Sequence, residues 1–433
     1  MSEATTQAAP AKPTVHHEHH FTFFRQSGWL MLATVLVGFL MIAVQSVAQH
    51  MPKAEYGVFM TLLQIVTLMG IPAVGLQGVF AQQAAGAMTP EHERDLAGVF
   101  RGVLRGTFFI WLLAAAAALI FQARILAALK ISNPAALWIT LAISLAALWR
   151  PVVSGILQGR QNFLWLGNVM IADGIGRLCG VLIIVGLLAN YAAGAMVAVL
   201  GGYLFVVGVA GWFSRDCLRG DAVPMDWIAW LRRLAPLTLG LGVGTFMLAA
   251  DMIFVQAFFP ANQTAYYAAA GMIGRALVYF TQPVATVMFP KLARSKATGQ
   301  KSNALALALG ITALAGAGAA LMCTFFPTLP LRLVRYGPSY LEISGALIPW
   351  FAWSMLPLTL ATVLINSLMA QSRFVAVPWL VAVAAGYALA LYFHHDTFKQ
   401  VIQILGIFST LLLAVCAWFT WGGKSAPARP SAA

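Results

Sequence analysis

Charged residues are unusually few in this sequence. Asp, Glu, Lys and Arg make up only 9% of its 433 residues, whereas 61% are hydrophobic. A water-soluble domain carries about 25% charged residues, so the composition excludes a chain surrounded by water. Cysteine is also scarce, and Cys179, Cys217, Cys323 and Cys416 lie far apart in the sequence. This spacing favours neither a disulfide framework nor a cysteine-based metal site.

The hydrophobic residues are concentrated in twelve runs. Each run has about 20 residues or more, the length that crosses a hydrocarbon core of about 30 Å as a helix. The runs lack strand-like alternation, and a helix satisfies its own backbone hydrogen bonds in lipid. We therefore predict an all-α polytopic membrane protein with about twelve transmembrane helices. The runs are Trp29–Ala48, Tyr56–Ala81, Val99–Phe121, Ala135–Gly155, Phe163–Leu188, Ala192–Phe213, Leu234–Phe258, Tyr266–Met288, Ala304–Phe326, Leu341–Leu364, Val375–Tyr392 and Val401–Phe419.

Lys and Arg are unevenly distributed between the segments that connect these runs. Segments on the side of the N-terminus hold about three times as many as the opposite segments, and cytoplasmic loops are the ones enriched in these residues. Both termini are therefore predicted to be cytoplasmic. The same bias accounts for the net charge of +13, because most Lys and Arg residues lie in short loops that face membrane lipids. The charge therefore does not indicate a nucleic-acid partner.

A weak internal repeat divides the chain into two halves of six runs. Six is an even number, so both halves begin on the same side of the membrane, as in transporters whose halves are related by an axis along the membrane normal. We predict two six-helix lobes, at 25–214 and 231–421, joined by a cytoplasmic linker at 215–230. The tails at 1–24 and 422–433 are predicted to be cytoplasmic, the first of them disordered. An offset of 211 residues pairs Ala54 with Ala265, Tyr56 with Tyr267, Pro72 with Pro283, Leu157 with Leu368, and Phe163 with Phe374.

Four stretches in the two halves resemble a known family of transporters. They are AEYGVFMTLLQIVTLMGIPAVGLQGVFAQQAA, LQGRQNFLWLGNVMIADGIGRL, TAYYAAAGMIGRALVYFTQPVATVMFPKLARS and YGPSYLEISGALIPWFAWSMLPLTLATVLINSLMAQSRF. Together they resemble the Wzx-like polysaccharide flippases of the polysaccharide transporter family. This family is a branch of the multidrug/oligosaccharidyl-lipid/polysaccharide (MOP) exporter superfamily.

The resemblance implies a fold and a function. The fold would be two six-helix bundles related by a pseudo-two-fold axis, in a V around a central cavity, as in the MATE branch. The function would be alternating-access transfer of a polyprenyl-diphosphate-linked oligosaccharide to the outer leaflet of the bacterial inner membrane. Glycosyltransferases and a glycan polymerase would be its partners in polysaccharide biosynthesis. The peptidoglycan-precursor branch usually has fourteen spans, so twelve runs disfavour lipid II as the substrate.

Five ionisable residues lie inside the predicted spans. A charge at the bilayer centre costs about 2.5–3.5 kcal/mol on insertion scales, so such residues usually face a partner or a wet cavity. Three of the five are arginines, and a guanidinium offers a planar pair of donors to phosphate oxygens. The surplus of guanidinium over carboxylate favours an anionic headgroup over an organic cation. The five predicted cavity residues are Arg150, Asp173, Arg177, Asp251 and Arg275.

Each of these residues has an alternative interpretation. Asp173 and Arg177 are four residues apart on one helix face, so they either neutralise each other or line a polar cavity. Arg150 lies near the cytoplasmic end of its span, where its side chain either extends to the headgroups or faces the cavity. Asp251 and Arg275 are expected to form a salt bridge, within one lobe or across both. Arg275 is the leading candidate for binding the diphosphate.

Two other functions compete with the flippase prediction. A cation-coupled multidrug exporter of the same superfamily would share the fold. A membrane glycan polymerase or ligase would need a substantial outer loop, and the longest here is the short segment Pro327–Tyr340. The stretch WGGKSA has Trp418 where a phosphate-binding loop requires Gly, and neither a zinc-peptidase motif nor a nucleophile elbow is present. We therefore expect a transporter and not an enzyme, with no cofactor and no resident metal.

Overall fold

The computed structural model describes residues 15–422, apart from 74, 88, 184–190, 220, 222, 225 and 279–303. All regular elements in these residues are helices, as predicted. Predictions made for residues 1–14, Pro283 and residues 423–433 lie outside the described residues.

The first half of the chain forms helices close to the predicted runs. They are α1 (Val15–Ala48), α2 (Lys53–Met69), η1 (Ile71–Ala73), α3 (Leu76–Gly86), α4 (Pro90–Ile120), α5 (Gln122–Ala128), α6 (Pro134–Gly159), α7 (Phe163–Ile183) and α8 (Ala192–Phe213). A short helix, α9 (Arg215–Arg219), follows in the linker. Helix α1 begins at Val15, so residues 15–24 are helical although the sequence placed them in a disordered tail. Extending an existing helix adds one hydrogen bond per residue, which allows α1 to continue beyond its apolar part.

The second half begins with α10 (Trp227–Phe258), which takes in the end of the predicted linker. Residues 261–278 form the next helix. The remaining elements are α12 (Ala304–Phe325), α13 (Leu329–Leu333), α14 (Pro338–Ala370), η3 (Phe374–Ala376), α15 (Val377–Phe393), α16 (Phe398–Ala417) and η4 (Trp418–Gly422).

These helices account for the twelve predicted spans, with α2 and α3 together forming one of them. Among the described residues, nine helices are long and apolar enough to cross a membrane alone, and the bent pair α2 and α3 forms a tenth span. The apolar part of α1, Leu32–Ala48, and the helix over 261–278 occupy the first and eighth positions. The predicted twelve-helix fold class is therefore confirmed.

The second span is broken at the proline that the sequence singled out. Pro72 lies in η1, and the chain bends by 43° between α2 and the segment Ile71–Gly86. A proline inside a helix removes a backbone hydrogen bond, which permits this bend. The bent region packs closely on α10, because a Cβ atom added at Gly242 would lie 2.5 Å from Ile71 Cγ2. Glycine is therefore needed where these two spans meet.

Backbone geometry confirms the internal repeat. Each half has a non-glycine residue with positive φ just after a short helix, namely Lys130 (53°) after α5 and Arg335 (65°) after α13. Each half also has one after a long helix, namely Gln161 (56°) after α6 and Ser372 (56°) after α14. Positive φ is uncommon outside glycine, so its recurrence at equivalent turns indicates two copies of one structural unit.

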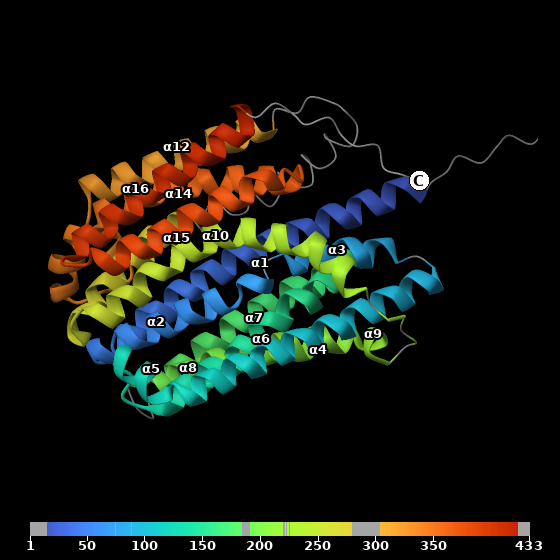
Figure 1. Cartoon of the computed structure of the whole chain (residues 1–433), viewed down its shortest axis with the longest axis horizontal. Coiled ribbons are helices and arrows are strands. Elements are labelled where there is room, and N and C mark those ends of the chain that lie inside the picture. Colours follow the sequence, from blue (N-terminus) through green and yellow to red (C-terminus); the bar gives the residue numbers. More distant parts are fainter. Residues whose placement is uncertain are drawn as a thin grey trace, which may run out of the picture.

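The two halves form separate groups of helices (Figure 1). The C-terminal half, α12 and α14–α16, lies at the top of the view in orange and red, and most of the N-terminal half lies below in blue to green. Helix α2 of the first half packs against α10 of the second. The starting end of α1 and the far end of α16 lie toward the same end of the molecule. We call these two groups of helices the N-lobe and the C-lobe.

Candidate functional site

A charged cluster lies inside the N-lobe, centred on Asp173 of α7. Arg177, one turn further along α7, donates from Nε to Asp173 Oδ1 at 2.9 Å and from Nη2 to Oδ2 at 3.0 Å. Arg150 of α6 approaches the same carboxylate, with Nη1 3.5 Å from Oδ2. The Asp173 side chain is only 2% exposed. Two guanidinium groups therefore share one buried carboxylate.

An aromatic side chain from α8 completes this cluster. The ring of Tyr203 lies 4.7 Å from the Arg177 guanidinium carbon and 5.3 Å from that of Arg150. The negative face of an aromatic ring attracts a cation, so Tyr203 stabilises both guanidinium groups. The adjacent Gly202 lets α8 come this close, because a Cβ atom there would lie 2.4 Å from Asp173 Oδ1. Helices α6, α7 and α8 thus jointly position the N-lobe cluster.

The N-lobe cluster carries more positive than negative charge and is partly open. The side chain of Arg150 is 28% exposed and that of Arg177 is 12% exposed. A guanidinium has five N–H donors, and Arg150 directs one nitrogen toward Asp173. The cluster can therefore accept an anion at Arg150 while Asp173 keeps Arg177 oriented.

The C-lobe contains a different arrangement, a closed ion pair. Arg275 donates from Nη2 to both carboxylate oxygens of Asp251, at 2.6 and 2.7 Å, and from Nε to the carbonyl of Leu248 at 2.7 Å. Tyr267 donates its hydroxyl to Asp251 Oδ2 at 2.8 Å. The Arg275 and Asp251 side chains are 3% and 0% exposed. One cation meets one anion here, so the pair is electrically balanced and enclosed.

The structure resolves the geometric alternatives that the sequence left open. Arg150 turns toward Asp173 and Tyr203 inside the lobe, so the expected alternative of an extension to the headgroups is not the arrangement found. Asp173 and Arg177 are paired, and the salt bridge between Asp251 and Arg275 lies within one lobe. Among the described residues, no ion pair joins the N-lobe cluster to the C-lobe pair.

Sequence reasoning missed three contributors to these sites, namely Tyr203, Gly202 and Tyr267. Tyr203 and Gly202 belong to the apolar stretch GGYLF, which carries no charge or motif. Tyr267 was paired with Tyr56 by the repeat, but that pairing says nothing about a carboxylate partner. Only the packing of neighbouring helices reveals their contacts.

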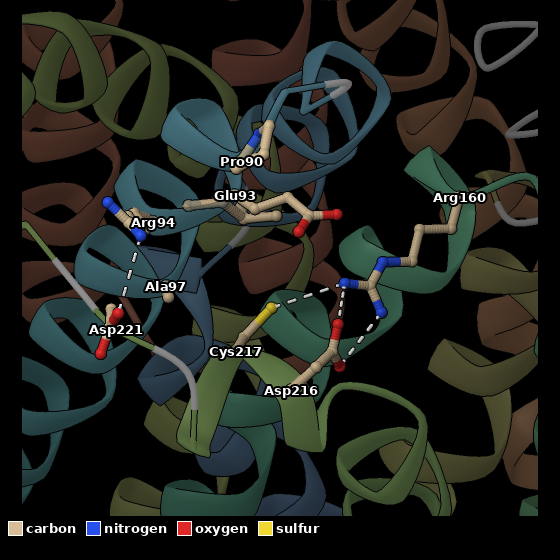
Figure 2. Close-up of a pocket in the computed structure, with 9 residues that line it drawn as sticks. Pro90, Glu93, Arg94, Ala97, Arg160, Asp216, Cys217 and Asp221 are labelled. Atoms are coloured by element: carbon tan, nitrogen blue, oxygen red, sulfur yellow. Dashed lines mark hydrogen bonds and ion pairs between the residues drawn. The ribbon is translucent and has the colours of Figure 1, made fainter.

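A separate pocket of about 240 Å³ lies where the linker meets the N-lobe (Figure 2). Arg160 extends from the end of α6 and forms a two-nitrogen hydrogen-bonded pair with Asp216 of α9. Arg94 of α4 lies 3.8 Å from Asp221. Glu93 adds a third acid to two bases, so the lining is slightly acidic. The pocket therefore does not suit a phosphate group, and its contacts instead fasten the linker to the N-lobe.

The ionisation of this linker reflects its contacts. Partial burial raises the pKa of Asp216, but the hydrogen bonds and charge of Arg160 outweigh it and leave that pKa below its ordinary value. Burial raises the pKa of the Cys217 thiol to about 11. Arg101 Nε also donates to the Cys217 carbonyl at 3.0 Å. Helix α9 is therefore held against α4 and the end of α6.

No cluster suited to a metal ion occurs in the part of the chain that the structure describes. The side chains of the N-terminal stretch HHEHH lie outside that part. The N-lobe cluster and the C-lobe pair consist of charged arginines and aspartates, each with a neutral tyrosine beside them. Arginine has no acceptor atoms, and its donors suit phosphate or carboxylate oxygens.

The fold is that of a two-lobed, all-helical membrane protein. No protein-family model matches the chain, and no curated protein matches it in sequence. Solved structures do match over nearly the whole length. The lipid II flippase MurJ, in an inward closed conformation, is 14% identical with a TM-score of 0.69, over 92% of this chain and 88% of that one.

Two further solved structures belong to the same superfamily. An inward-facing multidrug resistance MATE family transporter of the MOP superfamily is 15% identical with a TM-score of 0.68, over 90% of this chain and 93% of that one. A MOP superfamily transporter from Pyrococcus furiosus is 15% identical with a TM-score of 0.59, over 92% of this chain and 94% of that one. The chain therefore has the fold of MOP superfamily transporters.

Proposed function

We propose that this protein moves a polyprenyl-diphosphate-linked oligosaccharide from the cytoplasmic to the outer leaflet of the bacterial inner membrane. The observation that carries the proposal is the N-lobe cluster, in which Arg150 and Arg177 share the single carboxylate of Asp173. Its surplus positive charge inside the membrane suits a diphosphate. The resemblance of the sequence to Wzx-like flippases supports the same substrate class.

The contacts assign different roles to the two arginines. Asp173 holds Arg177 through two hydrogen bonds, which fixes the direction of its guanidinium. Arg150 is the more exposed of the two and makes the longer contact with Asp173, so it meets the diphosphate first. Tyr203 lies against both guanidinium groups and limits their movement. The lipid tail stays in the bilayer while the headgroup passes between the lobes.

Arg275 takes a different role in this proposal from the one predicted. Asp251 neutralises it, the Leu248 carbonyl accepts from its Nε, and only 3% of its side chain is exposed. In this conformation Arg275 and Asp251 join α10 to the helix over 261–278. We assign the first phosphate contacts to Arg150 and Arg177, and assign to Arg275 the stability of the C-lobe.

The two-lobed fold and the bent second span support transport by alternating access. Enzymes that build the oligosaccharide on its lipid carrier would supply the substrate on the cytoplasmic face. A glycan polymerase would consume it on the outer face. The topology that places both termini in the cytoplasm belongs to this proposal and rests on the distribution of Lys and Arg.

A multidrug exporter is the second candidate, because the MATE and MurJ structures are equally similar in fold. The polarity of the site separates the two. An exporter of organic cations needs surplus carboxylate, whereas the N-lobe cluster has surplus guanidinium. For the Pyrococcus furiosus transporter, the reverse polarity of its binding pocket is said to suggest a different function. The charge of the pocket is therefore a criterion that separates functions within this fold.

Complementation tests the proposal. The intact protein should restore surface polysaccharide to a bacterial strain that lacks its own polysaccharide flippase, and Arg150→Ala should lower that restoration at equal expression. The matched control is Arg219→Ala, because Arg219 lies in α9 outside the spans. Extrusion of cationic dyes without restoration of polysaccharide by the intact protein would contradict the proposal and support the exporter.

A further inference from the structure

The two lobes contact each other at the end of the molecule opposite the start of α1 (Figure 1). Two glutamines make matching contacts across this end. Gln49, the first residue beyond the end of α1, is a buried N-lobe residue that donates from Nε2 to the carbonyl of Val334 at 2.9 Å. Gln256, in the last turn of α10, is fully buried in the C-lobe and donates from Nε2 to the carbonyl of Leu129 at 3.0 Å.

These two contacts are related by the internal repeat. Each glutamine lies at the end of the first helix of its lobe. Each acceptor, Leu129 or Val334, follows the short helix of the opposite lobe, α5 or α13. Each acceptor also precedes a residue with positive φ, Lys130 or Arg335. Each lobe therefore has an equivalent turn with positive φ, and the carbonyl that precedes the positive-φ residue accepts a hydrogen bond from the other lobe.

Lys130 adds a third contact that its counterpart does not repeat. Its ammonium donates to the carbonyls of Gln256 at 2.8 Å, Ala257 at 3.0 Å and Phe259. The last carbonyls of a helix lack partners within the helix and carry partial negative charge, so a cation there is stabilised. Arg335, the counterpart of Lys130 in the C-lobe, is exposed. The Lys130 contact thus makes the closure asymmetric.

The lobes are tightly packed beside these contacts. Tyr56 and Tyr336, from opposite lobes, are joined through their hydroxyls at 2.7 Å. A Cβ atom at Gly57 would lie 2.2 Å from Thr264 Oγ1, so a side chain at position 57 leaves no room for the threonine hydroxyl. Thr264 is fully buried. This end of the molecule is closed in the conformation described.

We infer that Gln49, Gln256 and Lys130 form the gate that holds this end closed, and that all three contacts break when the lobes separate there. The inference rests on the alternating access of the proposed function. Each contact joins a side chain of one lobe to backbone carbonyls of the other, and water can replace either partner once the end opens. Because water replaces the lost hydrogen bonds, each contact contributes little net free energy to the closed state. A gate that reopens in every transport cycle needs such weak contacts. Under the proposed topology this is the outer gate.

Thiol labelling of Thr264→Cys reports the gate directly. The measurement uses purified full-length protein in detergent, with the four native cysteines replaced by serine and no substrate present. A maleimide reagent then reaches position 264 only when the lobes separate at this end. Gln49→Ala and Gln256→Ala should each raise the labelling rate about fivefold, the equivalent of one net hydrogen bond. Their combination should raise it further, and Lys130→Met should raise it as well.

Two matched controls distinguish the gate from general loosening. Gln400→Ala removes a glutamine that accepts from the Asp396 amide within the C-lobe, and Arg335→Met removes the counterpart of Lys130. Both should leave the labelling rate unchanged. Equal labelling in the gate variants and the controls, with melting temperatures unchanged, would overturn the inference. Because the readout needs no substrate, it can succeed even if the proposed diphosphate substrate is wrong.

Discussion

Arg150 of α6 and Asp173 of α7 are in contact inside the N-lobe, with Nη1 of the arginine 3.5 Å from Oδ2 of the aspartate. The same carboxylate holds Arg177 through two hydrogen bonds. A charge inside the membrane costs about 2.5–3.5 kcal/mol on insertion scales. One aspartate neutralises only one of the two arginines, so the cluster keeps a surplus positive charge, and the first two predictions follow from that surplus.

The first prediction concerns Arg150. Arg150→Ala should lower transport about tenfold or more at equal expression, because it removes a charge-assisted contact with the phosphate. Arg150→Lys should have an intermediate effect, since a lysine keeps the charge but not the planar pair of donors. The measurement is complementation of a flippase-deficient strain. Full activity of a well-expressed Arg150→Ala protein would remove this residue from the binding site.

The second prediction concerns the pair Asp173 and Arg177. Asp173→Ala should destabilise the protein more than the double substitution to alanine, because the single change leaves two arginines without their shared anion. The double variant should fold but transport poorly. Thermal unfolding in detergent measures the first effect and complementation the second. If the double variant transports normally, the pair serves stability alone.

The third prediction separates the two possible roles of Arg275. Arg275→Ala should destabilise the protein by about 3–5 kcal/mol, because it leaves the fully buried Asp251 unpaired. Replacing both residues, as Asp251→Asn with Arg275→Gln, should restore stability and most of the transport. If stability returns but transport does not, Arg275 has the direct substrate role that the sequence suggested.

The fourth prediction tests movement between the lobes. In a cysteine-free background, Gly57→Cys and Thr264→Cys should form a disulfide, since their Cβ atoms would lie 3.2 Å apart and need to separate by only a few tenths of an ångström to reach the roughly 3.5–4.5 Å of this bond. Oxidation should stop transport and a reducing agent should restore it. Each single cysteine variant serves as the control. Unchanged transport by the fully cross-linked protein would mean that this end of the molecule never opens.

The fifth prediction concerns the linker. Burial raises the pKa of the Cys217 thiol to about 11, so alkylation of this residue at pH 7 should be slow. Its rate should rise about tenfold per pH unit below that pKa, following the thiolate fraction. Arg160→Ala should speed the reaction by releasing α9. Fast alkylation of Cys217 at pH 7 in the intact protein would contradict the contacts seen around the pocket in Figure 2.

Much of the fold could be predicted because its determinants are local. Length and apolarity define a membrane helix, so the hydrophobic runs alone predicted all twelve spans. Pro72 also marked the break in the second span, because a proline acts on the helix that contains it. The start of α1 at Val15 was missed, since a helix that continues past the apolar run has no hydrophobic signal.

The site was predictable only in part, for a physical reason. The cost of burying a charge identified all five ionisable residues, and the four-residue spacing paired Asp173 with Arg177. The contact of Arg150 with Asp173 depends on how α6 packs against α7. The sequence of either helix alone does not predict that packing. Tyr203 was missed for the same reason. The enclosed state of Arg275 likewise follows from the position of α10 beside the helix over 261–278.

Direct translocation by the purified protein tests the central proposal. The protein would be reconstituted into liposomes that contain a fluorescent polyprenyl-diphosphate-linked oligosaccharide, and the fraction accessible to an impermeant quencher would be followed. The proposal predicts rapid exchange between leaflets with the intact protein, slower exchange with Arg150→Ala, and no exchange with the oxidised Gly57→Cys/Thr264→Cys protein. Exchange no faster than in protein-free liposomes, from a folded and correctly inserted protein, would contradict it.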